Sequence, residues 1–259
     1  MLPRPLAVVA AIAGLVATCS ASSASPPAGA YRYSPRTAAG LTRVTSPGGR
    51  HVSVVVADAY SARELFTRNP ARQRVLASNT KLFVTAAAAA RWGDAVAPTL
   101  AAILRPSDTA LAERLAARLG HGDRRAGVRA AVRFARAIGV RVRLRDAAGL
   151  DPANRTTARQ LVRFLLAMRW VSGFRAWERA LPVAGHSGTL AHRMRGTAAD
   201  GRCHAKTGTL FLRTLASTLS GYCTTRSGRA VVFSILVGGM AIEAARVLQD
   251  RIVARLAAG

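Results

Sequence analysis

The chain has 38 basic residues, and only two of them, Lys81 and Lys206, are lysines. Each lysine lies in a short motif that uses an amine: residues 78–81 read SNTK, an S-x-x-K motif, and residues 206–209 read KTGT. A lysine can lose its proton near neutral pH when its surroundings lower its pKa, whereas an arginine cannot. Because arginine fills all other basic positions, we interpret both lysines as groups that do chemistry.

The first motif predicts a nucleophile and its base. If Ser78 begins a helix, Lys81 follows one turn later on the same face, so the hydroxyl can meet the amine. The helix N-terminus favours the negative charge that develops nearby. Partly desolvated and close to a second cation, Lys81 could take the proton of Ser78. An isolated serine at this place would instead be interpreted as a helix N-cap.

The second motif predicts the binding side of the same site. Lys206 is the natural second cation and would hold a substrate carboxylate, while the hydroxyl groups of Thr207 and Thr209 add contacts. The backbone N–H groups of Ser78 and Thr209 would form an oxyanion hole. Together the two motifs predict an acyl-transfer site of the serine hydrolase kind.

Hydrophobic periodicity indicates the elements that position these residues. Helices are expected at residues 82–91, 110–119, 125–138, 159–169 and 242–256, and strands at 51–57, 64–67, 203–210, 214–223 and 229–237. Two strands, a helical block, three strands joined by short turns and a last helix predict an α/β fold. Its sheet is mostly antiparallel and flanked by helices.

The first residues differ from the rest of the chain. A basic Arg4, an apolar stretch at residues 6–16 and a run of small residues at 21–24 predict a cleaved signal peptide over residues 1–24. Cys19 offers a lipid anchor as the alternative. Residues 25–50 are predicted as a linker or N-terminal extension, and 51–259 as a single catalytic domain. The expected location is outside the cytoplasmic membrane, in the periplasm or cell wall.

Removal of the signal peptide leaves two cysteines, Cys203 and Cys223. An even number in an exported protein is compatible with one disulfide, and these two lie on strands expected to be neighbours. We therefore predict a cross-strand disulfide, with two free thiols as the alternative. The histidines at 186, 192 and 204 lack metal-ligand spacing, so neither a metal nor a cofactor is expected.

The formal net charge is +26. The arginines are spread through the whole chain, and no motif alternates basic with aromatic residues on which bases would stack. We therefore expect no nucleic-acid partner. A basic surface outside the cell suits anionic envelope polymers. Arginine at ordinary solvated positions explains the charge equally well.

Three segments resemble the penicillin-binding D-alanyl-D-alanine carboxypeptidases/endopeptidases of the low-molecular-mass class C type. Residues 76–83 (LASNTKLF) are similar to the nucleophile segment of that family, and residues 181–190 lead into the K-T-G segment as they do there. Ser107-Asp108-Thr109 takes the place of the family's S-x-N motif. The resemblance implies the fold of serine β-lactamases and penicillin-binding transpeptidases.

The resemblance also implies an activity. The substrate would be a peptidoglycan stem peptide ending in D-Ala-D-Ala, the intermediate an acyl-enzyme on Ser78, and β-lactams would acylate the same serine. Ser107 would relay a proton to the leaving amine, Lys206 would bind the terminal carboxylate, and Thr109 would contact the substrate.

The chain departs from the family pattern at three places. Thr109 replaces the asparagine of S-x-N, residues 146–150 (DAAGL) lack the serine of the family's D-G-S-G-L stretch, and only 25 residues separate Lys81 from Ser107, where the family carries inserted domains. A reduced helical lobe is therefore expected. These departures leave two alternatives open: a catalytically weak or inactive envelope-binding relic, and a serine esterase or β-lactamase-like hydrolase with the same chemistry.

Overall fold

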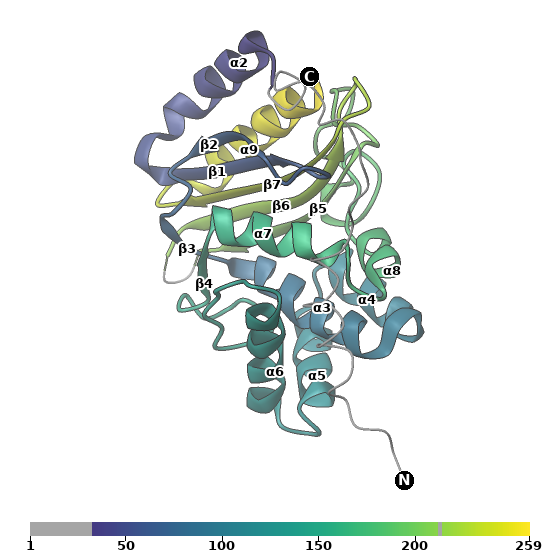
Figure 1. Ribbon diagram of the computed structural model, residues 1–259. Coiled ribbons are helices and arrows are strands. Elements are labelled where there is room, and N and C mark those ends of the chain that lie inside the picture. Colours follow the sequence, from purple (N-terminus) through teal and green to yellow (C-terminus); the bar gives the residue numbers. More distant parts are fainter. Residues whose placement is uncertain (1–32, 212–213) are drawn as a thin grey trace. The chain divides into compact units, whose positions relative to one another are not determined.

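The computed structural model describes residues 33–211 and 214–259. Their centre is a five-stranded sheet in the order β2-β1-β7-β6-β5, and every neighbouring pair is antiparallel (Figure 1). The strands are β1 (Val52–Asp58), β2 (Glu64–Arg68), β5 (Cys203–Leu210), β6 (Ala216–Thr224) and β7 (Ala230–Gly238). These bounds confirm all five strands that the sequence predicts, to within a few residues.

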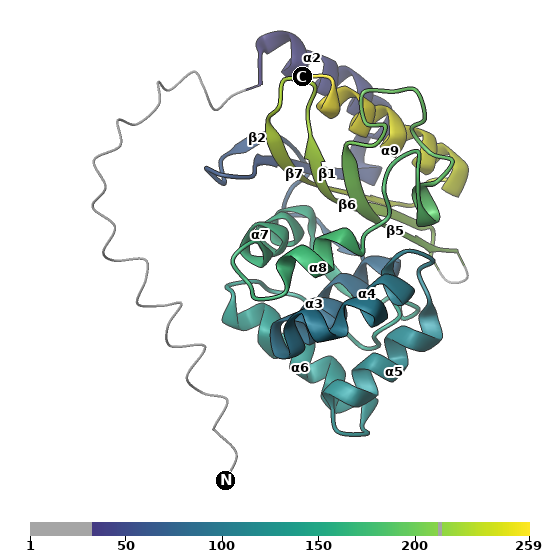
Figure 2. The same cartoon turned by 90° about the vertical axis from the view of Figure 1, so that its right-hand side faces the viewer.

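Helices cover both faces of this sheet, which explains why β1 is apolar at nearly every position. Val55 and Ala57 face one core, whereas Val52, Val54 and Val56 face another. Side chains alternate between the faces of a strand, so a strand that is covered on both sides is apolar throughout. Figure 2 shows the two helical layers on opposite sides of the sheet.

One face carries α2 (Pro35–Thr45) and α9 (Ile242–Ala257). Ser34 caps α2 by accepting a hydrogen bond from the Thr37 N–H, and Leu41 packs in the same core as Leu256. A short 3-10 turn, η1 (Ser46–His51), leads into β1. The described part of residues 25–50, which the sequence assigned to a linker or N-terminal extension, is therefore helical and packs against the sheet layer. The predicted signal peptide and Cys19 lie outside the described residues.

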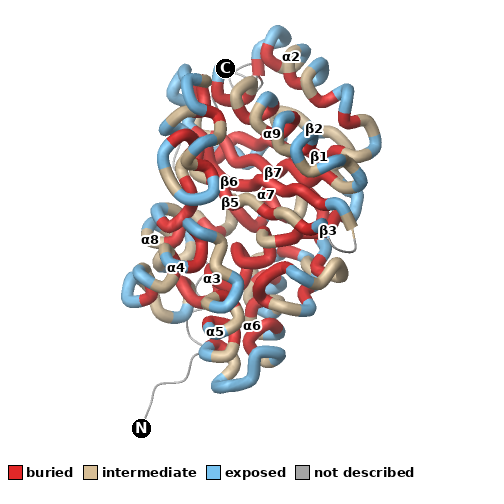
Figure 3. Tube along the Cα trace, turned by 180° about the vertical axis from the view of Figure 1, so that it is seen from behind, coloured by how far each residue is buried: buried red, intermediate tan, exposed pale blue. Residues whose placement is uncertain are grey.

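The other face carries the remaining helices. They are α3 (Thr80–Trp92), α4 (Ala97–Leu104), α5 (Thr109–Leu119), α6 (Arg124–Ala137), α7 (Ala158–Met168) and α8 (Phe174–Arg179). Helix α3 lies at the centre of this layer and is buried from Thr80 to Ala89, as the red tube of Figure 3 shows. Its alanines let neighbouring helices approach on all sides, which keeps the start of α3 in place.

Short elements connect the two layers. A two-stranded sheet pairs β3 (Gln73–Val75) with β4 (Arg155–Thr157), and 3-10 turns occur at η2 (Ala77–Asn79), η3 (Gly93–Val96) and η4 (Gly188–Leu190). Only η3 and α4 follow α3 before Ser107, which matches the expected reduced helical lobe. The sequence did not predict α4 or the six-residue α8.

Two tryptophans have different roles. Trp177 is fully buried and donates a hydrogen bond from its indole N–H to Thr85 Oγ1 at 2.9 Å. Trp170, in contrast, is 84% exposed. At the first residue of β5, Cys203 lies opposite Cys223 and the two form a disulfide, as predicted.

Among the described residues, no helix combines the length and apolar character needed to span a bilayer.

Candidate active site

Ser78 and Lys81 lie side by side where η2 passes into α3. Ser78 is in the 3-10 turn and Lys81 is in the first turn of the α-helix, which begins at Thr80. The Lys81 Nζ lies 2.9 Å from Ser78 Oγ. The α-helix thus begins two residues before the predicted residue 82, and Ser78 lies in the 3-10 turn ahead of it. The predicted pairing of hydroxyl and amine is present, because 3-10 and α geometry both bring residues i and i+3 together.

Lys81 is held in a buried position suited to a base. Its side chain is fully buried, and Nζ also donates to the backbone carbonyl of Ala148 at 2.6 Å. Burial lowers the pKa of Lys81 to about 8, while Asp146, Glu113 and Asp108 act in the opposite direction. The sequence assigned part of this lowering to Lys206, but desolvation is its main cause.

A loop at residues 145–154 supplies the Ala148 carbonyl, and two carboxylates hold this loop. Glu113 Oε1 accepts hydrogen bonds from the N–H groups of Ala147 and Ala148, both at 2.9 Å. Asp146 accepts from the backbone N–H groups of residues 149, 150 and 151 and from the Asn154 side chain. Neither Glu113 nor Asp146 was identified from the sequence as a positioning residue. For Asp146 a signal was available, because it begins the 146–150 stretch that resembles the family.

Two glycines press against the backbone around Ser78. Gly149 has φ +90°, and a Cβ there would lie 1.9 Å from the Ala77 carbonyl oxygen. On the other side, a Cβ at Gly208 of β5 would lie 2.3 Å from Thr218 Oγ1 and 2.9 Å from the Ser78 nitrogen. The nucleophile is therefore enclosed between a loop and a strand that come this close only without side chains.

Lys206 pairs with a second serine. Its Nζ donates to Ser107 Oγ and to the Thr207 carbonyl oxygen, each at 2.8 Å. The side chain is fully buried, and burial together with the neighbouring Lys81 lowers the pKa of Lys206 well below its usual value. Ser107 has φ +66°, a left-handed conformation that is unusual for serine. The structure thus joins the predicted relay serine to the predicted binding lysine. Lys206 lies on the edge strand β5, and its ammonium group is buried.

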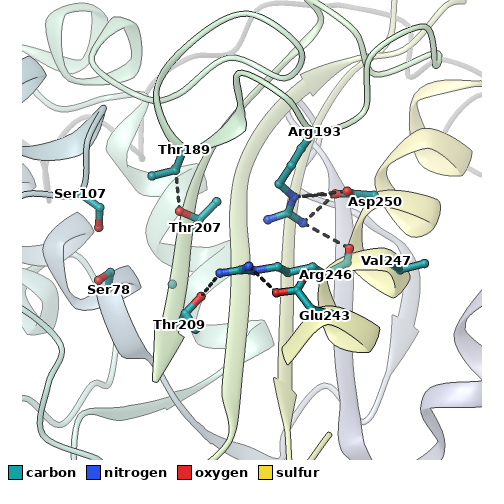
Figure 4. A pocket seen from close by; sticks show the side chains of 11 residues that line it. Ser78, Ser107, Thr189, Arg193, Thr207, Thr209, Glu243, Arg246, Val247 and Asp250 are labelled. Carbon is teal, nitrogen blue, oxygen red and sulfur yellow. Dashed lines mark hydrogen bonds and ion pairs between the residues drawn. The ribbon is translucent and has the colours of Figure 1, made fainter. Parts of the chain in front are cut away.

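A pocket of about 590 Å³ opens beside these groups (Figure 4). Ser78 and Ser107 lie on one side, β5 forms the floor with Thr207 and Thr209, and α9 forms the far wall. Thr207 Oγ1 lies 2.7 Å from Thr189 Oγ1. The hydroxyls of both threonines of the K-T-G-T segment therefore border the pocket, as the sequence predicts.

Thr109 does not join this group. It is the first residue of α5, its side chain is exposed, and it is absent from the described residues that line the pocket. Asp108, not Thr109, makes the local contact, because its carboxylate caps α5 by accepting from the Leu111 N–H at 2.7 Å. The role of Thr109 in substrate binding stays a prediction, as does the oxyanion hole of Ser78 and Thr209.

The histidines form no metal centre within residues 33–211 and 214–259. No cluster of three or more histidine, cysteine, aspartate or glutamate side chains occurs there. His186 Nε2 lies 3.1 Å from Asp200 Oδ1, and the His186 side chain is exposed.

Fold and site together define a class. The fold is that of the serine β-lactamases and penicillin-binding proteins: a five-stranded antiparallel sheet with helices on both faces. The site has the motifs of the same class, an S-x-x-K serine at the start of a buried helix and a K-T-G strand beside it. A β-lactamase from Chitinophaga pinensis DSM 2588 superposes with a TM-score of 0.69 over 86% of this chain and 98% of its own, at 13% identity. Penicillin-binding protein 4 (dacB) from Haemophilus influenzae, solved in complex with a β-lactam, gives 0.51 over 60% of this chain and 39% of its own, at 20% identity.

Residues 95–258, more than half of the chain, match the D-Ala-D-Ala carboxypeptidase 3 (S13) family. The chain belongs to this family. The match includes Ser107 and the K-T-G segment and begins after Lys81. The D-alanyl-D-alanine carboxypeptidase of Actinomadura sp. (strain R39) is 42% identical over 119 residues, which are 44% of this chain and 21% of that relative. The matched stretch thus spans about a fifth of the length of this curated relative.

Proposed function

We propose that the chain is an exported serine-type D-Ala-D-Ala carboxypeptidase that acts on peptidoglycan stem peptides through an acyl-enzyme on Ser78. The observation that carries this proposal is the distance of 2.9 Å between Ser78 Oγ and the buried Lys81 amine. A hydroxyl next to an amine with a lowered pKa is an activated nucleophile. Membership of the carboxypeptidase family supports the substrate class.

In the proposed acylation, Ser78 is the nucleophile and Lys81 is its base. Ser78 Oγ attacks the carbonyl carbon of the scissile peptide bond, and its proton passes to Lys81 Nζ. The backbone N–H groups of Ser78 and Thr209 stabilise the oxyanion. Collapse of the tetrahedral intermediate breaks the C–N bond, and the proton held by Lys81 passes through the Ser107 hydroxyl to the leaving amine of the last D-Ala, which leaves Lys81 neutral. Water then attacks the ester carbonyl carbon and gives a proton to Lys81. The ester C–O bond breaks, and Lys81 returns this proton to Ser78 Oγ.

The same nucleophile would react with β-lactams, since their strained amide takes the place of the peptide bond. The β-lactam bound to the structurally similar penicillin-binding protein 4 supports this part of the proposal. Action on peptidoglycan requires export, so we also propose a location in the periplasm or cell wall. Electrostatic contact of the arginine-rich surface with anionic envelope polymers belongs to the same proposal.

A labelling experiment tests the proposal. The protein, without residues 1–24, is incubated with a fluorescent penicillin, and the Ser78→Ala variant serves as the matched control. We expect covalent label on the wild type alone, together with release of D-Ala from a donor peptide that ends in D-Ala-D-Ala. Absence of label on the wild type would refute the acyl-enzyme. Label without D-Ala release would favour the envelope-binding relic, and rapid loss of label with hydrolysed penicillin would favour a β-lactamase-like hydrolase.

A further inference from the structure

The pocket extends beyond the reacting serine. It continues past Thr209 to the first turns of α9, where Glu243, Arg246 and Val247 form its far wall (Figure 4). Val247 is 48% exposed, so this end opens to solvent. Nothing in the acylation steps above uses these residues. The wall nevertheless carries charged groups within reach of a K-T-G-T hydroxyl.

Two arginines line this end, and one of them is fully engaged. The Arg193 guanidinium lies 2.6 Å from Asp250 Oδ1 and 3.1 Å from Gln249 Oε1, and it also donates to the backbone carbonyl of Arg246 at 3.3 Å. Its side chain is only 16% exposed. Arg193 therefore attaches the segment around residue 193 to α9 and has a structural role.

Arg246 is held much less firmly. Its guanidinium donates to Thr209 Oγ1 at 3.4 Å and to Glu243 Oε1 at 2.7 Å. The side chain of Glu243 is 79% exposed, and an ion pair at such a position contributes little stability. A guanidinium that already binds one carboxylate next to a hydroxyl has the donor geometry for a second carboxylate. Arg246 can therefore exchange Glu243 for an anionic ligand at low cost.

Lys206 offers no equivalent charge to the pocket. Its ammonium is fully buried, and two of its three donors are used by Ser107 and the Thr207 carbonyl. An arginine stays charged at every physiological pH. Among the described residues that line the pocket, Arg246 is thus the cation that is both close to Thr209 and held only by an exposed partner.

We infer that Arg246, together with the Thr209 hydroxyl, recognises the free carboxylate of the residue that leaves during acylation, and that Glu243 is the anion this carboxylate displaces. The inference rests on the proposed function and assigns to Arg246 the charge that the sequence assigned to Lys206. The enzyme then selects acyl donors that end directly after the scissile bond. Arg246 is a specificity residue: it contacts the substrate but takes no part in proton transfer.

Two donors with the same acyl part test this inference. One is a peptide ending in D-Ala-D-Ala with a free carboxylate, and the other is its C-terminal amide. Both yield the same truncated peptide, so kcat/KM is measured by mass spectrometry of a single product. We expect Arg246→Ala to lower kcat/KM for the carboxylate donor about tenfold to a hundredfold, as loss of a charge-assisted hydrogen bond does. The same variant should change kcat/KM for the amide donor by less than about twofold. Arg246→Lys should recover part of the kcat/KM that Arg246→Ala loses with the carboxylate donor.

Two further variants make the test specific. Glu243→Gln removes the resident anion, so the preference for the carboxylate donor should rise about twofold. Arg251→Ala removes an exposed arginine of the same helix and should leave kcat/KM unchanged for both donors. Replacement of the Arg246 side chain leaves its backbone carbonyl, so the contact with Arg193 is kept in all of these variants.

The outcomes separate the inference from the function on which it rests. One outcome is that the wild type releases product while Arg246→Ala lowers kcat/KM equally for both donors, or for neither. In that case the inference is wrong and the proposed carboxypeptidase activity is retained. The same holds if Glu243→Gln weakens the preference. If the wild type neither releases product from either donor nor takes up fluorescent penicillin, the proposed function fails and the inference fails with it.

Discussion

The two serine–lysine pairs look alike and have different surroundings. Each lysine is fully buried, and each amine lies within hydrogen-bonding distance of a serine oxygen. Three carboxylates act on Lys81 against the effect of burial, and its pKa is lowered to about 8. Burial and the adjacent Lys81 both lower the pKa of Lys206. The first environment suits a base that gains and loses a proton near neutral pH, and the second suits a hydrogen-bond donor held in one place.

The largest expected effect comes from the same exchange at both lysines. Lys81→Arg keeps the charge and removes the base, so second-order acylation by penicillin should fall about a thousandfold. Lys206→Arg keeps a hydrogen-bond donor next to Ser107 and should lower the same acylation rate only about tenfold. Stopped-flow or gel-based labelling measures both rates. Circular dichroism and thermal unfolding check that each variant folds. Equal losses in two folded variants would contradict the difference in role.

The glycines on either side of Ser78 extend the comparison to the backbone. Gly149→Ala combines a positive φ with a contact of 1.9 Å to a carbonyl oxygen, so we expect a loss of more than about 3 kcal/mol in the free energy of unfolding. Gly208→Ala meets a side-chain hydroxyl first, and its φ is not in the left-handed region, so a loss of about 1–3 kcal/mol is expected. Urea denaturation measures both. A larger loss at Gly208 would show that the strand, and not the 145–154 loop, is the more rigid neighbour of Ser78.

The smallest effect is a shift in pH dependence. Because the neutral form of Lys81 accepts the proton, acylation should rise with pH through the pKa of Lys81, about 8, and level off above it. Glu113→Gln keeps an oxygen for the Ala147 and Ala148 N–H groups and removes a negative charge that favours the ammonium form. The pKa of Lys81 should therefore fall, and the midpoint of the profile should move to lower pH. An upward shift would show that Glu113 does not act on Lys81 through its charge.

The sheet and most helices were predictable because their signals are local. Residues 203–210 were assigned as a strand with the bounds of β5, and the pairing of Cys203 with Cys223 follows from two neighbouring antiparallel strands. Helix α2 was missed because Pro35 and nearby glycine and serine suggest a loop, whereas Pro at the first turn and Ser34 as cap are compatible with a helix. The apolar face of α2 stabilises the helix only by packing against α9, which is distant in the sequence.

The sequence by itself determined the reactive pair. Ser78 and Lys81 are three residues apart, and a single helical turn brings their atoms together whatever the rest of the chain does. Only the tertiary structure decided what surrounds the pair. The Ala148 carbonyl comes from 67 positions beyond Lys81, and Ser107 meets Lys206 across 99 positions. Burial of both lysines, the carboxylates that act on one of them and the exposed guanidinium at Thr209 depend on how distant segments pack, which residue spacing along the chain does not encode.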